Sequence, residues 1–507
     1  MNEIDNLLTY KDHFLYDILN PRSIAIFGAN NNLIGTMGSM QLRNIIAGGG
    51  LNGKIFPVHP RLDKVQGINA YKSVLDLPII PDLAFLILPP SAVPTVMEEC
   101  GQKGIKRLLI TSGGFREVGG EGIKLSKEID SISKKYNMRF IGPNCLGIYN
   151  GWYGYPEIRD AYLNTLWVYK TPERGNISIA SQSGTIATQL SWYTNDLGIK
   201  IGKSISIGNE ANIDIVDFLD YFQKDPQTEV IGLYIEEVKR GKEFIRLAKE
   251  IVPQKPIIAI YAGGTEASTR SIMSHTGSIA GNQHIFEAVF TETGIIPTDS
   301  IADFLYFLRT FSFAQKFNIY PKGKNVAIVS DSGGAGSMMT KSLELNGLKV
   351  PEFSKELKSQ FIEKVPSTGS ANNPIDVTFH EDFFALIYKF PEMLVKSGEI
   401  NSVIVYGIYD FDELMELMES SGMKIDEPMK HIKDIIPSRV LKPMRRLMKK
   451  FSVPVFFVGP LPYRYLWNKM FMDYEIPLFS LWDQPPKCLA ALTNYSLNYK
   501  MKEQETK

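Results

Sequence analysis

The sequence has 507 residues, of which 44% are apolar and 22% charged, and its 55 Lys and Arg residues balance 55 Asp and Glu residues. This balance gives no electrostatic basis for nucleic acid or an anionic membrane as the main partner. The three cysteines are scattered without a CxxC pair, which argues against a disulfide framework and a structural zinc site. No apolar run of about 18 residues and no apolar N-terminal signal segment occur, so we expect a cytoplasmic protein of about three domains.

Short apolar runs rich in Ile and Val alternate with amphipathic segments along most of the chain. Examples are the runs at 23–27, 83–88, 107–111, 177–180, 230–235, 256–261 and 325–330. Such runs, bounded by Gly, Pro or Ser, are typical of strands buried on both faces, and helical patterns between them indicate βαβ units with parallel sheets. The fold class is therefore α/β.

Polar, turn-rich stretches at 150–176 and 315–324 divide the pattern into three predicted α/β domains. These domains cover residues 1–150, 151–316 and 317–507. A strand followed by a glycine loop opens each of them, as FGAN, SQSG and DSGG, which indicates three related doubly wound folds. Within the last domain, the Lys- and Met-rich region 418–450 lacks strand patterns, and we expect helices or a lid-like insertion there.

The first predicted strand runs into the loop 28-GANNNLIGTMGSM-40, whose glycines lead into a helix. Such a loop can present backbone N–H groups and a helix N-terminus to a phosphate, although a plain strand–helix turn would have the same glycines. Because the carboxyl ends of doubly wound strands converge on one crevice, we expect a nucleotide-containing ligand there. The residues assigned to this crevice are Gly28, Ala29, Asn30, Gly35, Pro57, Pro89, Ser112, Gly113 and Asn144.

Two further side chains near these loops receive no chemical role. Cys145 lies in the shaped loop 141-IGPNCLGI-148 with no histidine nearby in sequence, so a buried apolar role is favoured over a nucleophile. His59 stands between two prolines, which favours a surface loop residue.

The second domain begins with the strand–loop–helix segment 177-ISIASQSGTIATQL-190. Serine hydroxyls and free N–H groups at a helix start form an anion site, whereas simple capping would need only one such residue. We expect a phosphate to bind there. The residues assigned to the phosphate are Ser181, Gln182, Ser183, Gly184 and Gly277.

Small and hydroxyl residues surround His275 in 271-SIMSHTGSIAGNQ-283, so its imidazole is either a reactive group or a loop cap. Glu236 and Glu237 end the predicted strand 230–235, and a carboxylate there is costly to bury without a partner. An imidazole is a natural partner, because the nitrogen facing away from the carboxylate stays nucleophilic. This arrangement suggests phosphoryl transfer to and from histidine, with a solvated strand end as the alternative for the glutamates.

The order of IFGANN, IGPNCLGI, SQSG, SIGNEANID, YIEE, AGGTEA, SHTGSIAG and VSDSGGAG closely resembles the NDP-forming acyl-CoA synthetases, from about residue 15 to 495. The resemblance implies a Rossmann-like domain that binds coenzyme A, followed by two flavodoxin-like ligase domains. It also implies that His275 carries a phosphoryl group, that Glu236 orients His275, and that the helix after SQSG steadies the phosphate.

The implied reaction converts acyl-CoA and phosphate into acyl phosphate and CoA, then passes the phosphoryl group through His275 to ADP. The chain has no ATP-grasp module after its third domain, so the resemblance implies an α-type subunit of a hetero-oligomer. A separate ATP-grasp β-type subunit would bind ADP or ATP with magnesium. The chain departs from the family at Tyr261 and Gly264, where Lys and Arg are usual. The alternatives are a catalytically inactive CoA-binding homologue and, less well supported by the first loop, a Rossmann oxidoreductase.

Overall fold

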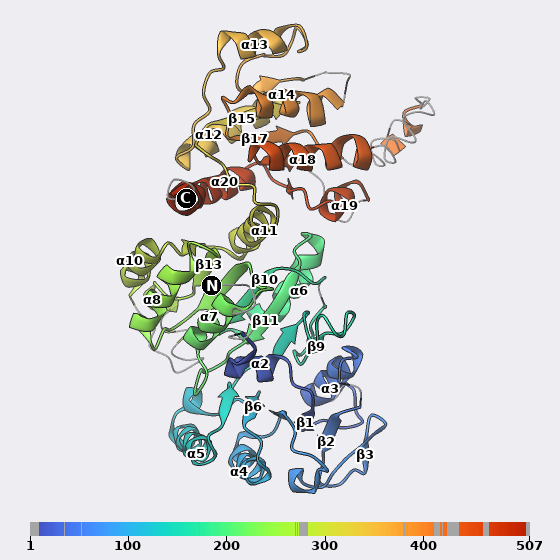
Figure 1. Ribbon diagram of the computed structural model, residues 1–507, viewed down its shortest axis with the longest axis vertical. Helices are drawn as coiled ribbons and strands as arrows, with labels where there is room; N and C mark the ends of the chain where they lie inside the picture. Colours follow the sequence, from blue (N-terminus) through green and yellow to red (C-terminus); the bar gives the residue numbers. More distant parts are fainter. Residues whose placement is uncertain are drawn as a thin grey trace. The chain divides into compact units, whose positions relative to one another are not determined.

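The structure is a computed structural model that describes residues 10–502, apart from residues 35, 52, 172, 269, 271, 273–281, 379–381, 383, 410–415, 418, 423–435 and 460–465. The chain forms two compact units (Figure 1). The first unit comprises Met1–Asn195 with Ile199–Phe304, and the second comprises Asp196–Gly198 with Leu305–Lys507. The two boundaries between the three domains drawn from the sequence stay predictions.

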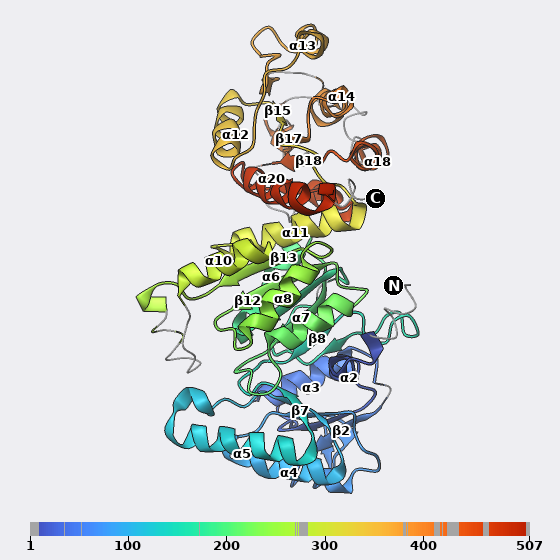
Figure 2. The ribbon, with the colours of Figure 1, turned by 60° about the vertical axis from the view of Figure 1, so that its left-hand side comes forward.

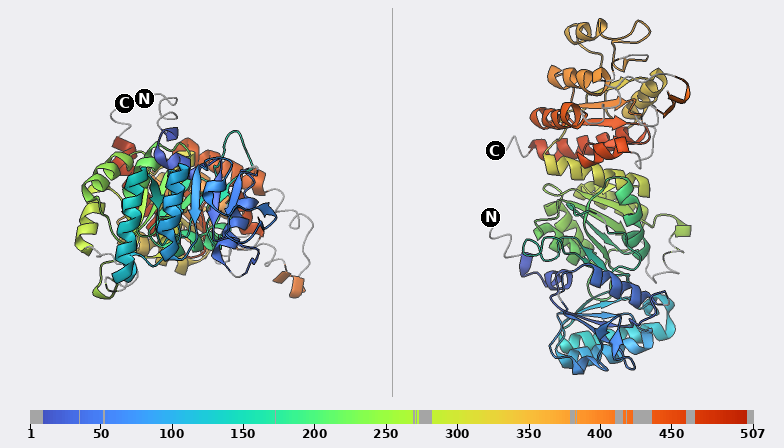
Figure 3. Two further views of the ribbon diagram at one scale, coloured as in Figure 1. Left: turned by 90° about the horizontal axis from the view of Figure 1, so that it is seen from below. Right: turned by 90° about the vertical axis from the view of Figure 1, so that its right-hand side faces the viewer.

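The first sheet of the first unit is parallel, in the order β2-β1-β5-β6-β7. Its strands are β1 (Ile24–Phe27), β2 (Ile55–Val58), β5 (Leu83–Leu86), β6 (Arg107–Ile110) and β7 (Arg139–Ile141). The helices around it are α2 (Phe14–Leu19), α3 (Met37–Ala47), α4 (Val93–Lys103) and α5 (Gly120–Tyr136), and β3 (Lys64–Val65) and β4 (Ile68–Asn69) form a small hairpin. Helices α4 and α5 lie side by side (Figures 2 and 3). Since the chain leaves β1 and β5 in opposite directions, their carboxyl ends flank the switch point where α/β sheets bind ligands.

The second sheet of this unit has the order β14-β13-β12-β10-β11-β8-β9. Its strands are β8 (Ile148–Asn150), β9 (Leu163–Asn164), β10 (Ile177–Ser181), β11 (Ile201–Ser206), β12 (Val230–Ile235), β13 (Ile257–Tyr261) and β14 (Ile296–Pro297). Its helices are α6 (Gly184–Asp196), α7 (Ile215–Lys224), α8 (Gly241–Ile251) and α10 (Gln283–Thr293), with α11 (Ile301–Phe317) following. Every residue of β10 is buried, as a strand covered by helices on both faces requires. The switch point lies between β10 and β12.

The strands β8 and β9 form an antiparallel edge on an otherwise parallel sheet. Although β8 lies at the predicted end of the first domain, it pairs with β11 of the second sheet. The Gln41 side chain of α3 donates hydrogen bonds to the carbonyls of Leu146 and Thr165, at 3.0 and 2.9 Å. Residues 146–165 therefore join the two sheets of the first unit.

The second unit contains one parallel sheet, in the order β16-β15-β17-β18-β19. Its strands are β15 (Val326–Ser330), β16 (Ile375–Asp376), β17 (Ser402–Tyr406), β18 (Val455–Val458) and β19 (Leu478–Phe479). Its helices are α12 (Gly333–Leu345), α13 (Lys355–Ile362), α14 (Phe390–Ser397), α18 (Lys442–Phe451), α19 (Leu466–Asp473) and α20 (Gln484–Tyr495). Helix α12 packs against α20, and α14 against α18, on the other side of the sheet (Figure 2).

The α/β fold class predicted from the apolar runs is confirmed by these sheets. Within the region 418–450, α18 accounts for the helix expected there, and most of the remainder lies outside the described residues. No helix in the described part of the chain is long and apolar enough to cross a membrane.

Candidate functional site

The loop after β1 closes tightly on the neighbouring strand. Gly28 has a φ of 84°, and a Cβ there would lie 1.8 Å from the carbonyl oxygen of Ile87, so no other residue fits. The N–H of Asn30 donates to the Ser39 hydroxyl at 3.0 Å, and Ala29 is only 2% exposed. Gly35, also predicted for this crevice, lies outside the described residues. Gly28, Ala29 and Asn30 thus lie at the carboxyl end of β1, at the first switch point.

Three of the predicted residues, Ser112, Gly113 and Asn144, come together in the loops that follow β6 and β7. The Ser112 hydroxyl after β6 donates to the Leu88 carbonyl at 2.6 Å, and the N–H of Asn144 donates to the Ser112 carbonyl at 2.9 Å. A Cβ on Gly113 would lie 3.3 Å from Oδ1 of Asn144. Pro89 follows β5, whereas Pro57 is buried inside β2 and pairs with Ile26, so Pro57 does not lie at a strand end.

Glu117, which sequence reasoning missed, connects the loops at the first switch point to the second sheet through Asn209, which the sequence had placed near the same crevice. Glu117 accepts the N–H of Gly114 at 2.6 Å with one oxygen and the side-chain amide of Asn209 at 2.6 Å with the other. Asn209 also accepts a hydrogen bond from the Asn144 side chain, at 3.3 Å. Because Asn209 follows β11, the crevice loops and the loops of the second sheet form one hydrogen-bonded junction.

The second switch point joins two of the predicted motifs through Gln182. The Gln182 side-chain oxygen accepts the N–H groups of Glu236 and of Glu237, the latter at 3.1 Å. Its amide nitrogen donates to the Glu237 carbonyl at 2.7 Å. These hydrogen bonds form a clamp that holds the loop after β10 against the end of β12. Glu236, which is only 7% exposed, lies directly at this clamp.

The other residues of the SQSG loop shape the start of α6. The Ser181 hydroxyl donates to the Ser183 carbonyl at 2.7 Å, and the Ser183 hydroxyl accepts the N–H of Ile186 at 3.4 Å. A Cβ on Gly184 would lie 2.7 Å from Cγ of Leu146, so this position is close-packed. His275 and Gly277 lie outside the described residues.

Charged side chains surround this clamp. Arg116 forms an ion pair with Glu237, with 3.3 Å between guanidinium nitrogen and carboxylate oxygen. Lys239 donates to the carbonyls of Asn209 and Glu210, at 3.0 and 2.6 Å, and its burial lowers its pKa. Burial also raises the pKa of the Glu210 carboxyl to about 8. Neither Lys239 nor Glu210 has a sequence pattern that separates it from a surface residue.

Two residues near the crevice keep the roles expected from the sequence. Cys145 is 1% exposed, its thiol donates to the Ile110 carbonyl at 3.2 Å, and burial raises its pKa to about 12, which disfavours a nucleophilic thiolate. His59 accepts the backbone N–H groups of Arg61 and Leu62 at 3.1 and 3.0 Å, which holds it in its loop.

Two family models match the chain. Residues 22–151 match the CoA binding domain, and residues 174–311 match the succinyl-CoA ligase like flavodoxin domain. These ranges contain the loops at the first switch point and the Gln182 clamp at the second.

Whole-chain similarities agree with these matches. The chain is 34% identical to the α subunit of ADP-forming acetate–CoA ligase II of Pyrococcus furiosus, over 76% of this chain and 80% of that protein. It is 37% identical to the ADP-forming acetate–CoA ligase of Methanocaldococcus jannaschii over 72% of this chain, and spans only 49% of that protein.

A solved structure also resembles the chain. The dinucleotide-forming acetyl-coenzyme A synthetase 1 of Candidatus Korarchaeum cryptofilum, in complex with phosphate and ADP, matches with a TM-score of 0.78 and 29% identity. The match covers 96% of this chain and 98% of that chain. On the similarity to the Pyrococcus α subunit, the chain belongs to the family of ADP-forming acyl-CoA synthetases.

Proposed function

We propose that the chain is the α-type subunit of an acyl-CoA synthetase that works through an acyl phosphate and a phosphohistidine. The observation that carries this proposal is the clamp in which Gln182 fixes the peptide of Glu236 and Glu237 beside the start of α6. It brings an anion-binding helix terminus and a buried carboxylate to one switch point, as phosphoryl transfer to an imidazole requires.

The proposed reaction has three reversible steps. Phosphate attacks the thioester carbonyl of acyl-CoA, the C–S bond breaks, and CoA leaves as acyl phosphate forms. His275 then attacks the phosphorus, and the carboxylic acid leaves as its carboxylate. Finally, phosphohistidine transfers its phosphoryl group to ADP, which gives ATP and free His275.

Each site residue has a role in this scheme. CoA lies in the crevice formed by Gly28, Asn30, Ser112 and Asn144, and the SQSG loop steadies the transferring phosphate. Glu236 accepts one imidazole N–H of His275, so that the other nitrogen stays nucleophilic. The junction of Glu117 and Asn209 keeps the thioester end of the crevice close to this loop.

The nucleotide half of the reaction belongs to a partner. Two α subunits of Pyrococcus furiosus ligases are 34% and 36% identical to the chain, and the chain spans 80% and 76% of their lengths. This supports a separate β-type subunit with an ATP-grasp fold that binds ADP or ATP with magnesium. Phosphohistidine would then reach two sites in a hetero-oligomer.

The test is covalent labelling of the purified chain with radioactive phosphate and a panel of acyl-CoA thioesters. We expect acid-labile, base-stable label in the wild type and none in His275→Ala. His284→Ala is the matched control, because His284 is a solvent-exposed histidine on α10, with its side chain 87% exposed. Labelling that persists in His275→Ala would refute the histidine assignment, and CoA binding without any label would favour the inactive CoA-binding homologue.

A further inference from the structure

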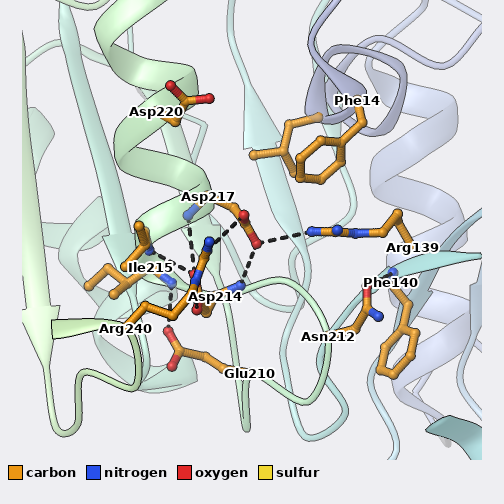
Figure 4. A network of polar contacts seen from close by, with 12 residues as sticks. Phe14, Arg139, Phe140, Glu210, Asn212, Asp214, Ile215, Asp217, Asp220 and Arg240 are labelled. Atoms are coloured by element: carbon orange, nitrogen blue, oxygen red, sulfur yellow. Dashed lines mark hydrogen bonds and ion pairs between the residues drawn. The ribbon is translucent and has the colours of Figure 1, made fainter. Parts of the chain in front are cut away.

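The loop 207–214, which follows β11 in the second sheet, is held against the first sheet by backbone hydrogen bonds. Three of its N–H groups donate to carbonyls of residues 140–143, at 2.9, 3.1 and 3.2 Å: Asn209 to Pro143, Ala211 to Gly142 and Ile213 to Phe140. Farther along, Arg139 of β7 pairs with Asp217 of α7, with 3.1 Å between guanidinium nitrogen and carboxylate oxygen (Figure 4). The end of β7 therefore carries this loop of the second sheet.

Asn209 is the most heavily bonded residue of the loop 207–214, and it is only 3% exposed. Its side-chain nitrogen donates to Glu117 at 2.6 Å, and its side-chain oxygen accepts from the Asn144 side chain at 3.3 Å. Its carbonyl accepts from Lys239 at 3.0 Å. Every polar atom of Asn209 thus has a partner, and these partners come from the loops after β6, β7 and β12.

Two neighbouring residues of opposite charge cross from the first sheet to the second. Arg116 and Glu117 begin the short helical turn Arg116–Val118, which follows β6. Arg116 pairs with Glu237 after β12, at 3.3 Å, while Glu117 binds Asn209 after β11. The other carboxylate oxygen of Glu117 accepts the N–H of Gly114, at 2.6 Å. Glu117 therefore ties a loop of its own sheet to a loop of the other sheet with one carboxylate.

The two sheets contribute different groups to the proposed reaction. The loops proposed to bind CoA belong to the first sheet, whereas the SQSG loop and Glu236 belong to the second, and His275 follows β13 in the chain. Attack of phosphate on the thioester therefore needs both sheets in place, while transfer from acyl phosphate to His275 uses groups of the second sheet alone. A displacement of about 1 Å between reacting groups can cost about 100-fold in rate.

We propose that Glu117 is a positioning residue for the thioester step alone. Through Asn209 it holds the loops that bind CoA at the distance from the SQSG loop at which a phosphate oxygen reaches the thioester carbonyl, so that the C–S bond breaks and CoA leaves. This inference rests on the proposed function. Glu117 does not touch the reacting groups, and the step that consumes acyl phosphate does not depend on it.

The test measures labelling of His275 in the purified chain from two donors, acetyl-CoA with radioactive phosphate and acetyl phosphate that carries the label. Glu117→Gln keeps an acceptor for Gly114 but turns an amide donor toward the Asn209 amide. Labelling from acetyl-CoA should fall about tenfold, the size expected for losing one hydrogen bond to a charged group. Labelling from acetyl phosphate should keep the wild-type rate. Glu121→Gln is the matched control, because Glu121 is 75% exposed on α5, and it should not change either rate.

Exchanging the two side-chain groups separates positioning from a general effect on the fold. Asn209→Asp alone places two carboxylates against one another and should slow labelling from acetyl-CoA further than Glu117→Gln does. In the double variant the new amide donates to the new carboxylate, which still accepts from Asn144, and the net charge equals that of the wild type. Labelling from acetyl-CoA should return to within about threefold of the wild-type rate, since the two changes are coupled.

Arg116→Met tests the same inference if the variants of Glu117 do not fold. It breaks the second bridge between the sheets, so labelling from acetyl-CoA should again slow and labelling from acetyl phosphate should not. The slowing should be about threefold, because the side chains of Arg116 and Glu237 are both partly exposed.

Three results would overturn the inference. Equal slowing from both donors would mean that Glu117 supports the fold in general, and a double variant as slow as Asn209→Asp would mean that the hydrogen bond is not responsible. If the wild type is labelled from neither donor, the proposed function fails, and the step assigned to Glu117 fails with it. Labelling of the wild type with equal loss from both donors in Glu117→Gln leaves the proposed function standing and removes only this inference.

Discussion

Two loops of this chain occupy the same topological position in different sheets and present different charge. The loop Ser181–Gly184 begins at the last residue of β10, at the switch point of the second sheet, and the loop Ser330–Gly333 begins at the last residue of β15, at that of the third. In both loops the first serine hydroxyl donates to a carbonyl two residues on, Ser181 to Ser183 at 2.7 Å and Ser330 to Ser332 at 2.8 Å. The backbone frames are therefore alike.

The residue after the first serine distinguishes the two loops. Gln182 is neutral and has its amide tied to the end of β12. Asp331 is a carboxylate whose burial raises its pKa, and it packs so tightly against the end of β17 that a Cβ on Gly407 would lie 2.6 Å from Asp331 Cγ. A helix N-terminus attracts anions in both cases, but only the loop after β15 itself carries a carboxylate, on Asp331. Helix geometry alone thus does not make an anion site.

The largest effect should come from placing a carboxylate in the loop after β10, where the loop after β15 has Asp331. Gln182→Glu keeps an acceptor for the N–H groups of Glu236 and Glu237, loses the donor to the Glu237 carbonyl, and places a negative charge at the phosphate. We expect the rate of His275 labelling to fall by about 100-fold. This is the size expected when a buried polar group loses its partner and like charges repel one another.

Gln102→Glu, the same change at an exposed position of α4, is the control and should label at the wild-type rate. Normal labelling of Gln182→Glu would mean that loop charge does not separate the two switch points.

A smaller effect should show which of the two similar loops takes part in the reaction. Ser181→Ala and Ser330→Ala each remove the hydrogen bond that a buried serine hydroxyl donates to the carbonyl two residues on, and Ser330→Ala also removes the acceptor of the Ser332 N–H. Each should lower the free energy of unfolding by about 1 kcal/mol. Denaturant unfolding measures this loss. Only Ser181→Ala should also slow labelling of His275. Equal slowing in Ser330→Ala would show that both loops serve the reaction.

The smallest effect concerns the carboxylate of the third sheet. The folded-state pKa of Asp331 is raised, so its ionisation weakens the fold, and stability falls as pH rises from the unfolded value through the raised one. Asp331→Asn removes this loss. Its melting temperature should exceed that of the wild type by about 1–2 °C at pH 7, a modest shift for a partly exposed group, and the gain should vanish near pH 3.

Asp382→Asn should change the melting temperature in the opposite direction. The pKa of Asp382 is lowered, and its carboxylate pairs with Lys389 at 2.6 Å. That variant should melt below the wild type at pH 7. An identical response of the two variants would contradict the account of Asp331.

Much of this fold could be predicted from the sequence because buried parallel strands leave a clear apolar signal. The runs 177–180 and 230–235 became β10 and β12, and the loops that follow them lie at the switch point. The antiparallel pairing of β8 could not be predicted, since three residues carry too little pattern to identify a partner strand. Pro57 was assigned to the crevice from a stretch that has the pattern of a second strand, and it lies within β2, which tolerates a proline at the edge of its sheet.

Site residues that belong to a sequence motif could be predicted, whereas those brought together only by tertiary contacts could not. The resemblance selected Ser181 and Glu236, and the structure adds that the Gln182 side chain joins their loops. Glu117 and Asn209 are about 90 residues apart in sequence, so their hydrogen bond leaves no local pattern. Glu210 has an ordinary polar context in sequence, and only its burial by α7 and Lys239 distinguishes it.

The edge strands β8 and β9 have a consequence for how the first unit unfolds. The chain passes from the first sheet into the far edge of the second, and Asn150 and Tyr153 there donate to the carbonyls of Leu19 and Pro21, at 2.9 and 2.7 Å. Neither sheet can melt without exposing buried groups of the other, so the two sheets of the first unit should unfold in one cooperative transition. A ligand held only in the first crevice would then raise the melting temperature of the second sheet as well.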